Sequence, residues 1–315
     1  MPDLNIQFAE GMQLARAPAS AADWARAMVL IERAADEGHA EAAERAALFE
    51  WMRARASAER GKALDRLQRA AELGSDSARD QLLVFAGAPH DLTEDISWTL
   101  VRTRIDVDWL IKPPDSQTVT ERPFVGVIEH FATPAECQWI ITQARRWLDL
   151  SAIQDPLTGE LRPDPMRTNK SAIIGGDRLD LVTEVIRTRI AAMLGVPLEY
   201  FEATQVMRYS PGEEFKPHHD YFDPAMEGFR GVLAHGGQRV ATVLIYLNDD
   251  FEGGETQFPS LGFNYRGRRG DAIAFANVDP DGRPNPLTLH AGLPPTSGEK
   301  WIFSQWVRDR VAGAA

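Results

Sequence analysis

One histidine and one aspartate, separated by a single residue, are the first side chains in this sequence whose spacing could support chemistry. His218 and Asp220 lie in residues 216–222, which we predict to form a β-strand. Residues two apart on a strand point to the same side of it. We therefore expect the His218 imidazole and the Asp220 carboxylate to converge, while His219 points away. Such a pair is half of a facial metal triad.

His290 supplies the third ligand in this interpretation, although it lies far along the chain from Asp220. The short strand candidates and turn signals after residue 201 suggest a β-sandwich or jelly roll, which brings distant strands together. Two histidines and one carboxylate leave neighbouring coordination positions open, as in non-haem Fe(II) oxygenases. The sequence thus predicts a metal site at His218, Asp220 and His290, with room for a cosubstrate and O2.

Lys300 starts an otherwise nearly uncharged strand candidate, residues 300–307, after the turn-forming residues 292–299. A buried lysine needs a partner of opposite charge. The far carboxylate of 2-oxoglutarate is the partner that fits, because the other end of that molecule chelates the iron. The alternative is a structural lysine that pairs with an internal Asp or Glu.

Seven stretches resemble, in family order, the prolyl 4-hydroxylase family of Fe(II)/2-oxoglutarate-dependent oxygenases. They are residues 202–209, 218–222, 237–242, 246–249, 253–259, 270–272, and 290–292 continued by 300–301. The resemblance covers residues 122–308 and implies a double-stranded β-helix (jelly roll). It also implies Fe(II), 2-oxoglutarate and O2 as cofactors, with ascorbate as a further candidate. A peptidyl residue, most simply proline, is the implied acceptor.

The same resemblance implies roles for residues outside the triad. Tyr209 corresponds to a tyrosine that hydrogen-bonds 2-oxoglutarate; the alternative is a tyrosine of the barrel core. Arg167, Glu202, Arg239 and Trp306 correspond to positions that line the peptide groove, so we predict that they bind the substrate.

Three groove positions depart from the family pattern. Asn169 follows Arg167-Thr168 where the family often has serine, Phe215 stands where peptide-hydroxylating relatives often carry tyrosine, and Arg308 stands where one has histidine. These departures bear on the acceptor and not on the metal chemistry.

Other polar segments have simpler interpretations. We expect residues 253–256 and Asp271 to serve turns, and His235 and His219 to stay outside the ligand set. Residues 151–169 form a long polar stretch with three prolines. A long loop in a domain of this size is usually functional or disordered, so we predict that it folds over the substrate as a lid.

The first part of the chain is rich in alanine and repeats itself. Seven residues at 27, 31, 33, 34, 35, 38 and 42 recur in kind at 63, 67, 69, 70, 71, 74 and 78. This period is typical of helix–turn–helix repeats, and residues 23–86 resemble Sel1-like repeats, relatives of the tetratricopeptide class. The resemblance implies a surface for a protein partner; the alternative is a helical cap on the next domain.

The chain as a whole is expected to be an α+β protein in three parts. Residues 1–88 would form the Sel1-like domain, 89–121 a connector with an edge strand, and 122–310 the dioxygenase domain. Helices are expected at 133–148 and 180–194. Strands are expected at 98–111, 124–130, 203–209, 216–222, 239–247, 271–276, 287–291 and 300–307.

Composition excludes several functional classes. The net charge of -12 disfavours nucleic-acid binding, and no apolar run is long enough to predict a membrane span. The single cysteine, Cys137, cannot form an internal disulfide. Because the start of the sequence lacks the pattern of a signal peptide, we expect a cytoplasmic protein.

Other functions remain open at this point. A hydroxylase of a free amino acid or other small molecule would need a closed pocket, whereas exposed Arg167 and Arg239 in an open slot would favour a peptide. A repeat-based interaction protein with a residual oxygenase domain is another alternative. A zinc hydrolase would use the same ligands, but it would not require Lys300.

Overall fold

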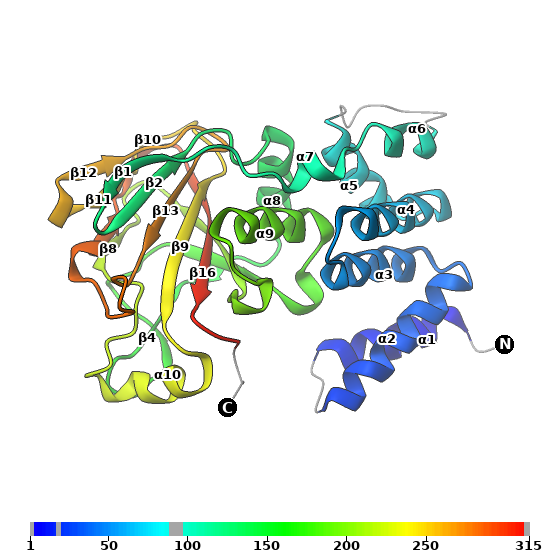
Figure 1. Cartoon of the computed structure of the whole chain (residues 1–315), viewed down its shortest axis with the longest axis horizontal. Coiled ribbons are helices and arrows are strands. Elements are labelled where there is room, and N and C mark those ends of the chain that lie inside the picture. Colours follow the sequence, from blue (N-terminus) through cyan, green and yellow to red (C-terminus); the bar gives the residue numbers. More distant parts are fainter. Residues whose placement is uncertain (1–2, 17–19, 88–96, 312–315) are drawn as a thin grey trace. The chain divides into compact units, whose positions relative to one another are not determined.

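Two units of different architecture make up the chain in the computed structural model, which describes residues 3–16, 20–87 and 97–311. The first unit contains residues 1–112 and 175–189, and the second contains residues 113–174 and 190–315. Helices form the first unit and strands dominate the second, so the chain is an α+β protein as predicted (Figure 1). Among the described residues, no helix combines the length and apolar character needed to cross a bilayer.

The first unit contains the helices α1 (Leu4–Arg16), α2 (Ala21–Asp36), α3 (Ala40–Arg53), α4 (Ser57–Leu73), α5 (Asp76–Ala86), α6 (Trp98–Thr103) and α7 (Val107–Ile111). It also takes in η1 (Gly176–Arg178) and the start of α9 (Leu181–Leu194), whose last residues belong to the second unit.

The sequence repeat has a structural counterpart in the packing of α2 to α5. The apolar members of the two repeated sets are buried: Ala27, Ile31, Ala34, Ala35 and Ala42 in one, and Ala63, Leu67, Ala70, Ala71 and Ala78 in the other. Small side chains at these positions let neighbouring helices approach closely. Gly38 and Gly74 both have a positive φ after the first helix of each pair, which favours glycine. The helix–turn–helix prediction is therefore confirmed, whereas the Sel1-like assignment stays a prediction.

The strand predicted at residues 98–111 is wrong, because this segment forms α6 and α7. The Ser97 side chain accepts a hydrogen bond from the backbone N–H of Leu100, and Asp106 accepts from Asp108 and Trp109. These N-caps satisfy backbone donors that would otherwise lack partners at the start of each helix. Capping thus outweighs the β-branched composition that suggested a strand.

The described residues of the second unit form 16 strands: β1 (Gln117–Glu121), β2 (Phe124–Ile128), β3 (Asp149–Leu150), β4 (Ala152–Gln154), β5 (Leu161–Pro163), β6 (Lys170–Ile174), β7 (Thr204–Tyr209), β8 (Phe215–His218), β9 (Arg239–Tyr246), β10 (Glu252–Gly253), β11 (Thr256–Phe258), β12 (Phe263–Tyr265), β13 (Ala272–Ala276), β14 (His290–Gly292), β15 (Pro295–Ser297) and β16 (Lys300–Arg308). Its helical elements are α8 (Pro134–Arg145), α10 (Arg230–Gly236), η2 (Leu198–Tyr200), η3 (Glu227–Phe229), η4 (Pro259–Leu261) and η5 (Pro286–Thr288).

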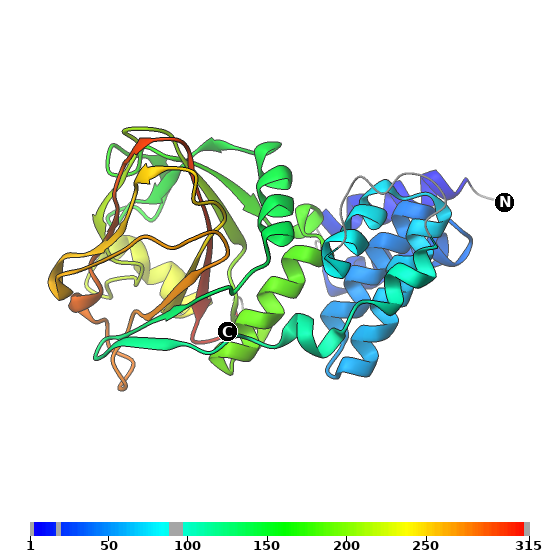
Figure 2. The same cartoon turned by 90° about the horizontal axis from the view of Figure 1, so that it is seen from above.

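An eight-stranded sheet and a four-stranded sheet are the main layers of this unit. Their strand orders are β1-β2-β13-β9-β16-β7-β6-β3 and β12-β11-β14-β8, and the paired strands run antiparallel. Seen from above, the strands wrap around the interior of the unit (Figure 2). This is the jelly roll that the sequence predicted.

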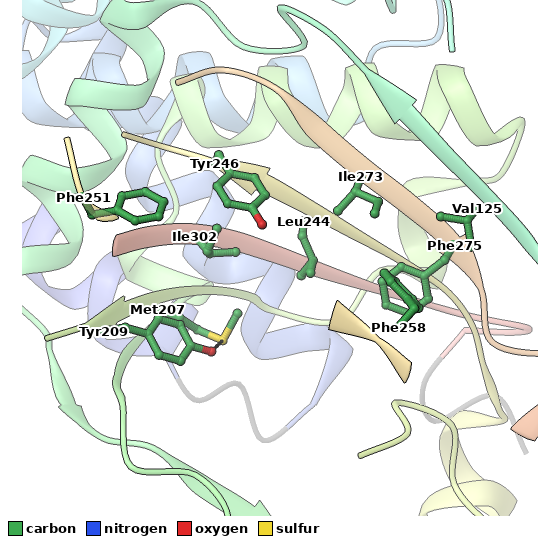
Figure 3. Close-up of a cluster of buried hydrophobic side chains, with 10 residues drawn as sticks. All are labelled: Val125, Met207, Tyr209, Leu244, Tyr246, Phe251, Phe258, Ile273, Phe275 and Ile302. Atoms are coloured by element: carbon green, nitrogen blue, oxygen red, sulfur yellow. Dashed lines mark hydrogen bonds between the residues drawn. The ribbon is translucent and has the colours of Figure 1, made fainter. Parts of the chain in front are cut away.

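The core of the second unit lies between the two sheets. Figure 3 shows buried side chains from β7, β9, β13 and β16 of the larger sheet, together with Phe258 of the smaller one. Alternate residues face inward, such as Leu244 and Tyr246 on β9 or Met207 and Tyr209 on β7. Outside the sheet, α8 packs on β6 and β7, and Thr133 and Glu136 form the capping box that begins it.

We predict that Ala70→Leu destabilises the helical repeats. Ala70 is fully buried in α4, so a larger side chain must displace its neighbours. We expect a loss of about 1–3 kcal/mol in the free energy of unfolding, measured by urea denaturation of the full chain. Ala58→Leu, at an exposed position of the same helix, is the control and should change stability by less than about 0.5 kcal/mol. Equal effects of the two changes would contradict the packing described for α4.

Candidate metal and cosubstrate site

Two histidines face each other across a pair of strands in the smaller sheet. His218 is the last residue of β8 and His290 the first of β14, and the two are register partners in the antiparallel pair. The strand predicted at 216–222 therefore ends earlier than expected, and Asp220 lies just beyond it. Asp220 nevertheless joins the histidines, because the chain after β8 turns its carboxylate into the barrel.

The three predicted ligands form a tight group. The Nε2 atom of His218 lies 3.6 Å from Oδ1 of Asp220, and Nε2 of His290 lies 3.6 Å from Oδ2. One ligand atom from each residue lies within 4.8 Å of the others. The structure thus brings together the residues that the sequence selected for a metal ion.

Electrostatics keeps Asp220 and His290 in the forms that bind a metal. Burial alone would raise the pKa of Asp220, but the nearby His290 and His218 outweigh it and hold that pKa well below its usual range. Burial, helped by His218, lowers the pKa of His290 to about 4. At pH 7 the carboxylate is therefore charged and His290 is neutral, and these are the forms required for coordination.

Backbone carbonyl groups orient both imidazoles. The Nδ1 atom of His218 lies 2.8 Å from the oxygen of Lys216, and Nδ1 of His290 lies 3.0 Å from the oxygen of Thr288. A carbonyl can only accept, so each Nδ1 carries the proton and each Nε2 is left with a free lone pair. Phe215 stacks on His218 with ring centroids 3.4 Å apart, which further fixes that ring.

Lys300 lies deep in the same barrel and is 1% exposed. Its Nζ atom is 5.0 Å from the ring of Tyr209 and 5.5 Å from the ring of Tyr246. Burial lowers its pKa to about 7, and Glu255 offsets only part of that effect. Among the described residues, the structure records neither a hydrogen bond nor an ion pair for this ammonium group. It is a buried cation that still needs an anion.

A cavity of about 30 Å³ connects this lysine with the triad. Ser304 and Trp306 also line it, and the Ser304 hydroxyl and the Trp306 indole N–H are buried without a hydrogen-bond partner among the described residues. A free cation at one end, metal ligands at the other and unpaired donors along β16 between them suit a guest that is rich in oxygen. These residues therefore fit Fe(II) together with a dicarboxylate.

The structure explains why a tyrosine and a glycine occupy two positions near Lys300. Tyr209 is the register partner of Lys300 and lines the cavity, and burial raises its pKa to about 12, so its hydroxyl keeps its proton and can donate. Gly254 lies beside Lys300, and a Cβ atom there would come 3.2 Å from Cδ of the lysine. The glycine was predicted to serve a turn; it also leaves room for the lysine side chain.

The predicted groove residues surround a second cavity of about 270 Å³, which shares His218 and Asp220 with the first. Arg239, Arg167 and Trp306 line it, and Arg239 stacks on Trp306 at 3.9 Å. Glu202 lies against Arg239, whose Nε and Nη2 donate to it over 2.6 and 2.7 Å. Glu202 thus acts on the groove through the arginine that it holds.

Arg167 is more buried than a groove arginine was expected to be, at 6% exposure. Its guanidinium donates to Asn169, the Ala152 carbonyl, Gln205 and the sulfur of Met207. The side chain of Arg239 is 17% exposed. Exposure of the two arginines therefore does not by itself separate a peptide groove from a small-molecule pocket.

Two functional candidates were missed by the sequence analysis. The Thr242 hydroxyl donates to Oδ2 of Asp220 over 2.7 Å, and Asn277 donates to the same hydroxyl over 2.9 Å. Thr242 lies on β9 two residues before Leu244, so its side chain points to the same side of the strand as Leu244, into the barrel. The alternation along that strand, together with its place in the family-like stretch 237–242, is the signal that could have pointed to it.

The remaining polar candidates stay outside the ligand set, as expected. His219 contacts the carbonyl oxygen of Pro286 and stacks on Tyr221, and His235 lies on α10 and contacts the carbonyl oxygen of Gly231. Asp271 accepts hydrogen bonds from backbone N–H groups in a turn.

We predict that Lys300→Met stabilises the ligand-free protein. The pKa of Lys300 is about 7 in the fold but 10.5 in a free side chain, so the unfolded chain binds the extra proton between these values. The lysine therefore costs stability in full below pH 7, and this cost fades as the pH rises toward 10.5, with an upper bound of roughly 5 kcal/mol. Urea denaturation at pH 6.5 and pH 9.5 should show a large gain from the substitution at the lower pH and a smaller one at the higher. An equal gain at both would contradict the shifted pKa.

Comparison with known proteins agrees with this geometry. The model of the 2OG-Fe(II) oxygenase superfamily matches residues 204–308. Prolyl 4-hydroxylase 1 of Arabidopsis thaliana is 36% identical over 215 residues, which are 64% of this chain and 73% of that protein. Probable prolyl 4-hydroxylase 10 of the same plant is 31% identical over 242 residues, 70% of this chain and 80% of that one.

Among solved structures, the viral collagen prolyl hydroxylase of Paramecium Bursaria Chlorella virus-1, in complex with 2OG, is 28% identical. It covers 60% of this chain and 98% of its own, with a TM-score of 0.46. The superfamily uses Fe(II), 2-oxoglutarate and O2, and the triad described above is the iron site that this chemistry requires. On its sequence identity to the plant enzymes, this chain belongs to the prolyl 4-hydroxylase family of 2OG-Fe(II) oxygenases.

Proposed function

We propose that this protein is a 2-oxoglutarate-dependent dioxygenase that hydroxylates proline in a peptide. The observation that carries the proposal is the sharing of His218 and Asp220 by two cavities. One cavity ends at the unpaired Lys300, and the other is the larger groove. A cosubstrate in the first and an acceptor in the second would meet at the triad.

The residues of the first cavity have distinct roles in this proposal. His218, Asp220 and His290 hold the metal through two imidazoles and a carboxylate. Lys300 pairs with the distal carboxylate of 2-oxoglutarate, and the protonated Tyr209 hydroxyl donates a hydrogen bond to it. When bound, Fe(II) with 2-oxoglutarate and O2 supplies the oxidising power: succinate and CO2 are released, and one oxygen atom goes to the acceptor.

The second cavity suits an apolar segment of a peptide. Most of its lining is apolar or aromatic: Ala152, Ile153, Pro156, Leu161, Met166, Phe215, Phe222, Phe229 and Trp306. A proline ring has no polar atom beyond the backbone, so such a wall can bury it without leaving a group unpaired. Arg167 and Arg239, with Gln154 and Gln205, supply polar groups that can orient the main chain of the acceptor. The plant relatives are prolyl 4-hydroxylases by name, which supports the same acceptor.

We predict that proline-containing peptides gain one oxygen atom when incubated with the full-length protein, Fe(II), 2-oxoglutarate and ascorbate. Mass spectrometry would locate the added oxygen on proline. Asp220→Ala removes the carboxylate of the triad, so it should abolish both the modification and the release of succinate. Equal succinate from wild type and Asp220→Ala would refute the triad. Oxidation of a free amino acid but of no peptide would instead show a small-molecule hydroxylase.

The predicted lid contains a small hairpin formed by β4 and β5, and it meets η3 beside the groove. The backbone N–H of Gly228 donates to the Pro156 carbonyl over 3.0 Å. A Cβ atom on Gly228 would lie 2.6 Å from the nitrogen of Gly159 and 2.7 Å from the oxygen of Asp155. Both segments line the cavity. We propose that this glycine contact holds the hairpin over the acceptor.

We predict that Gly228→Ala weakens acceptor binding. The alanine methyl group would push the hairpin away from η3, so the KM for a proline peptide should rise by roughly tenfold, which corresponds to about 1.4 kcal/mol. The 2-oxoglutarate requirement should not change. Gly231→Ala is the matched control, because nothing lies within 4 Å of a Cβ atom there. Steady-state kinetics that show the same KM for both variants would rule out the hairpin as a lid.

A further inference from the structure

We infer that Thr242 and Asn277 are positioning residues for Asp220 and thereby set the metal affinity of the site. The inference rests on the metal centre of the proposed function but not on the identity of the acceptor. It concerns a hydrogen-bonded relay, Asn277–Thr242–Asp220, that begins in the larger sheet and ends at a carboxylate held by no regular strand.

Asp220 needs an anchor because of where it lies. β8 ends at His218, so the ladder of hydrogen bonds that fixes β8 against β14 stops two residues before Asp220. Its two neighbours in the triad are fixed differently, through backbone carbonyl groups that hold Nδ1 of each imidazole. The carboxylate has no such contact, and its side chain could rotate unless another group holds it.

Thr242 is the group that holds the carboxylate. Its hydroxyl lies 2.7 Å from Oδ2 of Asp220, and the residue is fully buried on β9. β9 lies between β13 and β16 in the larger sheet, so the backbone of Thr242 is fixed on both sides. A rigid strand therefore places a donor at one oxygen of the Asp220 carboxylate.

Asn277 fixes the direction of the relay. Its Nδ2 atom lies 2.9 Å from the Thr242 hydroxyl and can only donate, so that hydroxyl accepts from Asn277 and turns its own proton toward Asp220. Asn277 is itself fully buried, its N–H donates to the Val240 carbonyl, and its carbonyl accepts from Asn285. Asn277 donates to the Thr242 hydroxyl, and that hydroxyl donates to Asp220. The relay therefore favours the charged carboxylate in one orientation.

The energetic cost of burying an unpaired oxygen atom at Asn277 supports a functional reason for this relay. The Oδ1 atom of Asn277 is buried and has no hydrogen-bond partner among the described residues. An apolar side chain at this position would avoid that cost. Outer hydrogen-bond partners of metal ligands orient the ligand, and their loss typically weakens metal binding by roughly 10- to 100-fold.

The test measures the dissociation constant of Co(II) for the metal-free full-length protein by isothermal titration calorimetry. Thr242→Val keeps the shape of the side chain but removes the hydroxyl, and we expect binding weaker by roughly 10- to 100-fold. Thr242→Ser restores the hydroxyl and should return the dissociation constant to within about threefold of wild type. Asn277→Leu should weaken binding as well, and adding it to Thr242→Val should cause no further loss, because both act on one carboxylate.

Thr204→Val is the matched control for a lost buried hydroxyl. Thr204 is also fully buried in the larger sheet and donates over 2.7 Å, but to Gln305 and not to a metal ligand. It should leave Co(II) binding unchanged. Wild-type affinity in a folded Thr242→Val, or an equal loss in Thr204→Val, would overturn the inference. A protein that binds Co(II) as described but oxidises no proline peptide would refute only the proposed function.

Discussion

Two opposite charges buried in an apolar barrel constrain the rest of the second unit. Asp220 is 5% exposed and Lys300 is 1% exposed, and an isolated charge in such surroundings is expensive. Two imidazoles and the Thr242 hydroxyl compensate the carboxylate, whereas the described residues offer the ammonium group no direct partner. The ligand-free protein therefore keeps an unsatisfied cation at one end of a small cavity. An anion that binds there relieves this cost, which makes the strain a source of affinity for the cosubstrate.

The pairing of antiparallel strands places the charged groups and the metal ligands around the cavity. Along β16, the alternate residues Lys300, Ile302, Ser304 and Trp306 line the inner cavity. The same strand thus provides the cation, an apolar wall and the residue at which the second cavity begins. On the opposite sheet, one register pair, His218 with His290, sets the position of the metal. A slip of one residue in either pairing would turn these side chains out of the barrel.

Residue types and the order of the motifs were enough to predict the triad and the lysine, although the period of two along a strand does not account for Asp220, which lies beyond the end of β8. Residue spacing also predicted the helical repeat, in which the recurring alanines are buried. The sequence did not reveal that β8 stops before Asp220, since the end of a strand depends on its partner β14. It could not reveal Thr242 and Asn277 as partners of Asp220, because their hydrogen bonds join three separate segments. Residues 98–111 were mistaken for a strand because side-chain caps outweighed composition.

The three departures from the family pattern meet at the arginines of the groove, and one of them, Phe215, also contacts a metal ligand. Asn169 accepts from Nε of Arg167, and the guanidinium of Arg167 lies 4.8 Å from the ring of Phe215. Arg308 forms an ion pair with Glu202, the residue that also holds Arg239. Each departure therefore alters the contacts of Arg167 or Arg239, the two arginines that line the second cavity. The hydrogen bonds around the triad do not involve the three departing residues. Phe215 alone touches both regions, since it also stacks on His218. The departures at Asn169 and Arg308 thus leave the contacts of the metal ligands unchanged, whereas Phe215 links the groove to the metal site.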